Sequence, residues 1–107
     1  GLLALDALSS GDSNTAIGYN AGSSINTGSD NVLIGSQAGD ALNSGSNNVA
    51  IGKNALSAED TTGNNVAVGH EALKNQNASS NAINVAVGYE AGQEITTATK
   101  VALLLAF

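Results

Sequence analysis

The sequence predicts an all-β protein of the β-solenoid class, in which the chain winds into successive coils and equivalent residues stack on one another. The first observation is a repeat. A phrase of the form Asn-Val-Ala-Ile-Gly recurs five times, and its glycines lie 17, 17, 17 and 19 residues apart. The second is that each repeat holds one short apolar segment, a glycine and a polar stretch. A unit of this length fits one solenoid coil and is too short for a pair of helices.

The composition supports a thin core that is repeated many times. The 107 residues include one Phe, two Tyr and no Trp, Met, Pro or Cys, although 42% are hydrophobic. Large aromatic side chains usually supply much of the area buried in a compact core. Their scarcity argues against a single thick core, and the absence of Cys excludes a disulfide scaffold or a thiolate metal site.

The repeats divide the chain into one repeat domain, residues 1–107. Five full rungs occupy residues 14–100. Degenerate edge rungs are expected at residues 1–13, which contain "GLLALDAL", and at residues 101–107, "VALLLAF". We therefore expect about seven rungs, spaced about 4.8 Å apart as in any β-stack.

Asparagine opens each full rung, and glycine ends its apolar segment. Stacked asparagine amides can form a hydrogen-bonded ladder along the solenoid, and glycine suits a corner with positive φ or close backbone approach. The asparagine column is Asn14, Asn31, Asn48, Asn65 and Asn84, and the corner column is Gly18, Gly35, Gly52, Gly69 and Gly88.

The strand segments are apolar on both faces. Val49 and Ile51, two residues apart, share one face of a strand, and we assign that face to the coil interior. The residue between them is Ala50, where a water-facing side chain would be polar. Strands with two apolar faces are usually buried on both, so we expect this middle column to form an interface with other copies of the chain. The column is Ala16, Leu33, Ala50, Ala67, Ala86 and Ala102.

The phrase "NVAIGKNAL" and its counterparts resemble the head repeats of trimeric autotransporter adhesins and similar repeats of phage and viral tail-fibre attachment proteins. The resemblance covers residues 14–92, although the coils are longer than the usual unit of that family. It implies a left-handed parallel β-roll that forms a homotrimer through the strand face. It also implies an adhesive or spacer role on an extracellular, cell-surface or virion fibre.

The sequence offers little chemistry for catalysis, cofactor binding or metal binding. Its only histidine, His70, follows a corner glycine, and Glu71 and Glu90 occupy the next column, so we read all three as surface residues. Asp12 and Asp30 lack the further carboxylates that a calcium site needs. We therefore predict no enzyme activity, no cofactor and no bound metal.

Charge and hydropathy restrict the partners. The net charge is −6, with three basic residues in total, so phosphate neutralisation is lacking and nucleic acid is excluded. The apolar run at the end is far too short to span a bilayer, so no membrane insertion is expected.

Three classes of function remain to be weighed. The first is an adhesive fibre module in which polar loops bind a surface glycan or protein receptor through avidity, with a bare spacer as its simpler form. The second is a subunit that stacks end to end, since both edge rungs are leucine-rich. A glycan-cleaving enzyme is the third and finds little support. The longest loop is the candidate contact site: Lys74, Asn75, Gln76, Asn77, Ser79, Ser80 and Asn81.

Overall fold

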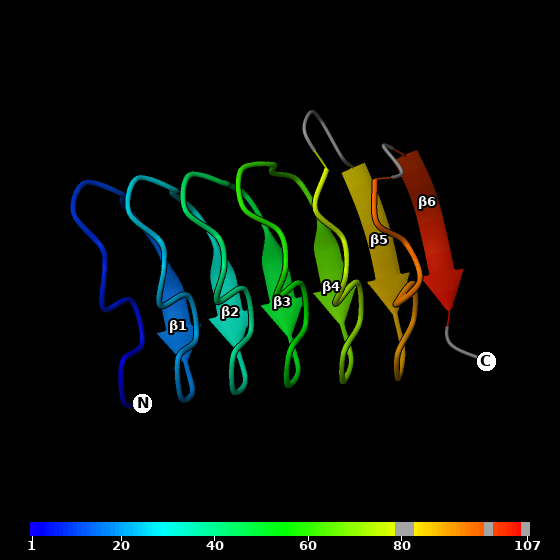
Figure 1. The fold of residues 1–107 in the computed structure, drawn as a ribbon, viewed down its shortest axis with the longest axis horizontal. Coiled ribbons are helices and arrows are strands. Elements are labelled where there is room, and N and C mark those ends of the chain that lie inside the picture. Colours follow the sequence, from blue (N-terminus) through cyan, green and yellow to red (C-terminus); the bar gives the residue numbers. More distant parts are fainter. Residues whose placement is uncertain (79–82, 98–99, 106–107) are drawn as a thin grey trace.

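A computed structural model describes residues 1–78, 83–97 and 100–105, the last range for its backbone only. The chain is an all-β parallel solenoid whose strands form one sheet in chain order (Figure 1). The solenoid class predicted from the sequence is therefore confirmed. The strands are β1 (Thr15–Ile17), β2 (Val32–Ile34), β3 (Val49–Ile51), β4 (Val66–Val68), β5 (Ile83–Val87) and β6 (Lys100–Leu105).

The sheet pairs each repeat column with itself. Val32 pairs with Val49, and Ala50 pairs with Ala67, so β1 to β4 follow the 17-residue period without a shift. The longer repeat before β5 keeps the same columns, because Ala67 still pairs with Ala86. The two extra residues are therefore accommodated outside the strands.

The two ends of the solenoid depart from the expected rungs. In the described part of the chain the sheet has six strands, and residues 2–7 form turns. This segment still stacks on the next coil, since Leu5 N donates to Ala21 O at 3.1 Å. At the other end the register shifts, so that Leu104 and not Ala102 pairs with Ala86. The column assignment of Ala102 was therefore wrong.

The corner glycines occupy backbone conformations that L-residues avoid. All five have φ between 129° and 135°. A Cβ placed on Gly52 would lie 2.4 Å from the carbonyl oxygen of Gly69, directly above it in the stack. Both the backbone conformation and the close stacking of coils therefore require glycine at these corners.

The two faces of the sheet are the reverse of the prediction. Leu33, Ala50 and Ala67 are fully buried inside the coil. The flanking β-branched residues face outward, and Ile17 is 57% exposed. A side chain enclosed by its own chain cannot contact another copy, so the assignment of the middle column to a subunit interface was wrong. This correction covers Ala16, Leu33, Ala50, Ala67 and Ala86, whereas the side chain of Ala102 lies outside the described residues.

Alanine lies inside because the coil is thin. The strand's inner column faces a second buried wall, built from Ala21, Ala38, Ala55, Ala72 and Ala91 and from the residues that follow them. Where the inner column holds Leu33, the facing position in the same coil is Gly39, whose added Cβ would lie 2.7 Å from the Leu33 side chain. Where the inner column holds Ala50, that position is the buried Leu56. In the coils of Leu33, Ala50 and Ala67 a large residue on one wall thus faces a small residue on the other, which fills the coil.

A further core column runs through segments that the sequence analysis treated as uniformly polar. Ile25 and Leu42 are fully buried, one coil apart. Glu59 and Gln76 continue the same column and are also fully buried. An aliphatic residue recurring every 17 positions in otherwise polar loops was the signal that could have revealed it.

Candidate functional site

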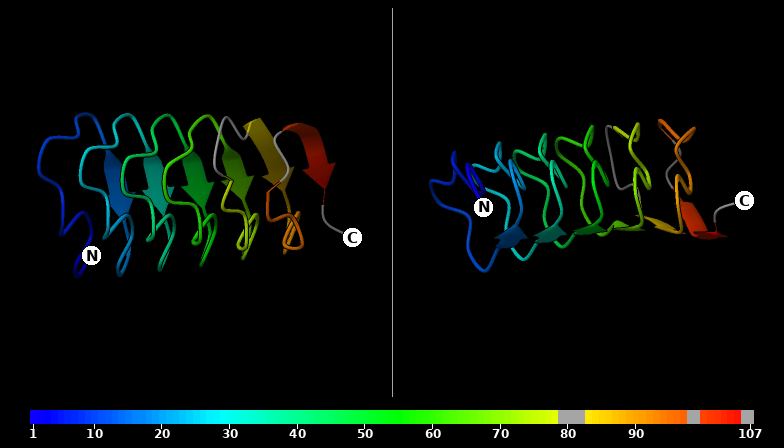
Figure 2. Two further views of the ribbon diagram at one scale, coloured as in Figure 1. Left: turned by 45° about the horizontal axis from the view of Figure 1, so that its top comes forward. Right: turned by 90° about the horizontal axis from the view of Figure 1, so that it is seen from below.

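The outer face of the sheet is an apolar surface that the described chain leaves partly uncovered. Figure 2 shows the strands along one side of the solenoid and most of the described return segments on the other side. Exposure is greatest at the ends, with Ile17 at 57% and Val87 at 37%, and the side chains between them are half-buried by their own neighbours. The face consists of Thr15, Ile17, Val32, Ile34, Val49, Ile51, Val66, Val68, Val85 and Val87.

No charged residue interrupts this face between β1 and β5. Monomeric soluble proteins rarely expose continuous apolar patches of this kind, and those that exist usually mark contact surfaces. β-Branched side chains have few rotamers, and on a pleated sheet they are regularly spaced, so they pack well against another surface. The outer face is therefore suited to packing against another apolar sheet.

The asparagine column forms a ladder along the stack. The side-chain oxygen of Asn31 accepts from the backbone N–H of Asn48 at 2.9 Å, and that of Asn48 accepts from Asn65 at 3.0 Å. The side-chain amide of Asn48 donates sideways to the carbonyl of Thr62 at 3.1 Å. Since Asn31, Asn48 and Asn65 are fully buried, each rung fixes the register of the next. Equivalent bonds join Asn14 to Asn31 and Asn65 to Asn84.

The candidate contact loop is only partly available for contact. Gln76 is fully buried, so its assignment as a contact residue was wrong. Lys74 pairs with Glu71 at 3.0 Å, and Asn75 donates to the carbonyl of Gln93 at 2.9 Å. Asn77 is exposed. Ser79, Ser80 and Asn81 lie outside the described residues.

A buried polar group near this loop was missed by the sequence analysis. The carboxylate of Glu59 accepts from the side-chain amide of Gln76 at 2.7 Å and from the backbone N–H of Thr62 at 3.2 Å. Asp60 and Ala78 also donate their N–H groups to it, at 3.1 and 3.4 Å. The oxygen of Gln76 accepts in turn from Asn84. This network ties the return loop of the β3 coil to the β4 coil.

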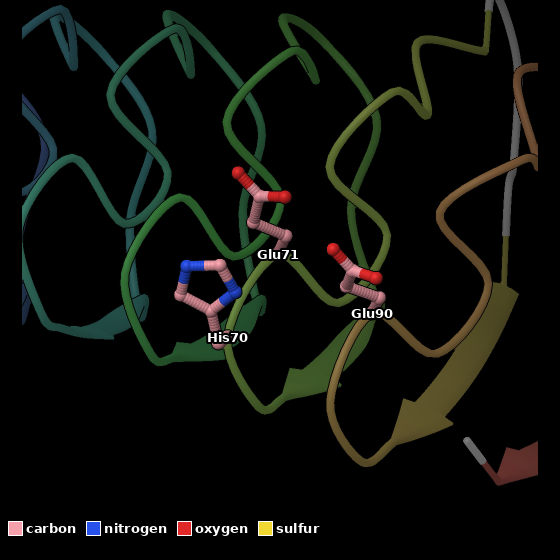
Figure 3. A group of neighbouring side chains, drawn as sticks. All are labelled: His70, Glu71 and Glu90. Atoms are coloured by element: carbon pink, nitrogen blue, oxygen red, sulfur yellow. The ribbon is translucent and has the colours of Figure 1, made fainter. Parts of the chain in front are cut away.

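A second group of polar side chains gathers at the corners that follow β4 and β5. His70 and Glu71 follow Gly69, and Glu90 occupies the position of Glu71 one coil later. One possible ligand atom from each of the three lies within 4.8 Å of the other two. Figure 3 shows the three side chains projecting to the same side of this corner. Stacking of coils has thus brought together residues that the sequence analysis read as separate surface groups.

The surroundings of this group orient its members. The His70 ring stacks on Tyr89, with centroids 5.2 Å apart and planes inclined by 9°. Glu71 accepts from Lys74 at 3.0 Å and from Gln93 at 2.8 Å. The Lys74 hydrogen bond lowers the pKa of Glu71 below its ordinary value. Glu71 is therefore a carboxylate at neutral pH.

No protein-family model matches this chain, and neither the curated proteins nor the solved structures include a match. None of the described residues belongs to a helix long and apolar enough to cross a membrane.

Proposed function

We propose that the protein is a non-enzymatic structural and adhesive module of an extracellular fibre, on a cell surface or a virion. In this proposal three copies associate through their outer sheet faces, and the coils wind in the left-handed sense. The observation that carries it is the uncharged, apolar outer face that runs from β1 to β5. The left-handed winding and the number of copies rest on the resemblance of the repeated phrase to adhesin head repeats.

Burial of the outer face supplies the driving force for association. Apolar area removed from water contributes roughly 25 cal/mol per Å², and the face offers two parallel columns of Val, Ile and Thr side chains. Closed symmetry lets identical faces meet around one axis and leaves none uncovered. The proposal thus retains the association of several copies that the sequence analysis expected. It places the interface on the outer Val, Ile and Thr columns and no longer on the alanine column.

The polar loops lie away from the sheet and would remain outside such a trimer (Figure 2). Many equivalent loops on one particle can bind a surface glycan or protein weakly at each point and firmly in total. With a net charge of −6 on each chain, the particle would not bind nucleic acid.

Ile51→Lys tests the interface directly. This substitution places an ammonium group on the outer face, whose burial against an apolar partner is strongly unfavourable. We expect the wild type to sediment at about three times the 10.5 kDa mass of the chain, and the variant as a monomer with a β-type circular dichroism spectrum.

Lys53→Glu is the matched control, because Lys53 is exposed at the corner just beyond the same strand. It should leave the sedimentation mass unchanged. A wild type that stays monomeric at high concentration would contradict the proposal, as would an Ile51→Lys variant of wild-type mass.

A second candidate function is a subunit that assembles end to end into filaments. Leu2, Leu3 and Leu8 favour it, since they are 71%, 42% and 37% exposed at one end of the solenoid. Stacked strands at a solenoid end also offer unpaired backbone groups to a neighbour. Electron microscopy of the purified protein separates the two candidates: long uniform filaments support this one, and discrete short particles support the trimer.

A further inference from the structure

We propose that His70, Glu71 and Glu90 form a binding site for a divalent transition-metal ion of the Zn²⁺ class. The site lies at the stacked corners after β4 and β5 and is independent of the outer sheet face. It departs from the sequence-based prediction of no metal, which treated the two glutamates as unrelated surface charges.

The solenoid itself creates the juxtaposition. The backbone N–H of Glu90 donates to the carbonyl of His70 at 2.7 Å, so the two corners are fixed one coil apart. Glu71 and Glu90 therefore project in register from adjacent coils (Figure 3). Two carboxylates held this close repel each other unless a cation lies between or beside them.

The donor set suits zinc better than magnesium or calcium. One imidazole nitrogen and two carboxylate oxygens are ligands that Zn²⁺ accepts, whereas Mg²⁺ and Ca²⁺ prefer oxygen alone. Tetrahedral zinc with bonds of about 2.0 Å needs ligand atoms about 3.3 Å apart. The three ligand atoms lie within 4.8 Å of one another on partly buried side chains, so small side-chain rotations would close the site.

The imidazole provides a second and independent observation. Nδ1 of His70 is buried and makes no hydrogen bond with any described residue. A buried polar atom without a partner is uncommon and calls for an explanation such as an ion. Stacking on Tyr89 holds the ring beside the carboxylates, so this nitrogen is oriented before any ion arrives.

Hydrogen bonds to Glu71 resemble the outer shell of a metal site. Gln93 donates to one oxygen of Glu71 at 2.8 Å, and Asn54 donates to the other at 3.5 Å. Ligating carboxylates are commonly oriented by such bonds. The equivalent corners of other coils carry Tyr19 with Asn20 and Ser36 with Gln37, so the donor set is not a requirement of the repeat.

Lys74 would compete with the metal ion for the carboxylate of Glu71. Its ammonium group lies 3.0 Å from Glu71, and its side chain is 36% exposed, so it can turn into water when a cation binds. The like charges of Lys74 and the ion repel each other. Removal of Lys74 should therefore tighten metal binding, which is a gain that misfolding cannot imitate.

The test is a Zn²⁺ titration by isothermal calorimetry, with protein that carries no histidine tag because His70 is the only histidine. We expect one Zn²⁺ per chain in the wild type, and weaker binding by more than about tenfold in His70→Gln and Glu90→Gln. Lys74→Gln should bind more tightly than the wild type. Circular dichroism of each variant checks that it is folded.

Glu94→Gln is the matched control, since Glu94 is exposed and lies outside the cluster, and the substitution removes the same charge as Glu90→Gln. It should bind Zn²⁺ as the wild type does. Thermal melting provides a second readout, because an ion that binds the folded state raises the melting temperature. Equal affinity in the wild type, His70→Gln and Glu90→Gln, or no binding to the wild type, would overturn the proposal.

Discussion

Ala50→Lys should prevent the protein from folding, whereas Ile51→Lys, one residue later, should leave the coil intact. Ala50 is fully buried between the sheet and the facing wall, and Leu33 and Ala67 lie above and below it in the same column. A lysine there must either bury an unpaired ammonium group or force the coil open. We expect the loss to exceed about 4 kcal/mol, since isolated buried charges are among the costliest substitutions.

Urea unfolding followed by circular dichroism measures this difference. Ala50→Lys should lack the cooperative transition of the wild type, and Ile51→Lys should retain one. The pair is informative because both substitutions place the same residue in the same three-residue strand, on opposite faces. A cooperative Ala50→Lys variant of wild-type stability would contradict the assignment of the inner face.

Glu59→Leu should destabilise the protein, even though the equivalent position of the preceding coil is the buried Leu42. The substitution leaves the amide of Gln76 and the N–H groups of Thr62 and Ala78 without their acceptor. Each buried donor left without a partner costs roughly 1–3 kcal/mol. We expect a total loss of about 4 kcal/mol by chemical denaturation.

A double-mutant cycle with Gln76→Leu shows whether the two buried polar side chains act together. In the Gln76→Leu background, Glu59→Leu no longer leaves a side-chain amide unpaired, so its cost should fall by about 1–2 kcal/mol. The backbone donors remain unpaired, so recovery should be incomplete. Strictly additive losses would mean that Glu59 and Gln76 do not stabilise each other.

The solenoid fold, its 17-residue period and its corners could be predicted from the sequence. Each of them depends on a position of the repeat that is occupied by the same residue type in every full rung. Asparagine and glycine recur at fixed positions, and only a stacked parallel arrangement brings like residues together. The residues of the strands themselves were also predictable, because Val49 to Ile51 is the only segment of its repeat that contains valine or isoleucine.

The orientation of the strand could not be predicted from its own residues. Val49, Ala50 and Ile51 are apolar on both faces, so the alternation of the strand is the same whichever face points inward. The facing wall decides the matter. Leu56 and Leu73 already occupy the interior of the coils of Ala50 and Ala67, so alanine fits opposite them, and a full column of valine and isoleucine would overfill so thin a coil.

The buried glutamate and the corner cluster escaped prediction for different reasons. Glu59 lies in a stretch whose composition is that of a surface loop, and only its alignment with Leu42 reveals that it is inside. His70 and Glu90 are 20 residues apart in the sequence, and they meet because one coil separates them in space.

The most direct test of the central claim is the reactivity of single thiols in a protein that has no cysteine of its own. Ala50→Cys and Ile51→Cys are compared for their rate of reaction with a maleimide, at concentrations at which the chain is monomeric. The inner-face assignment predicts that the Ala50→Cys thiol reacts only when the protein unfolds and that the Ile51→Cys thiol reacts in the folded state. Fast reaction of Ala50→Cys together with protection of Ile51→Cys would contradict it and would return the alanine column to the outer face.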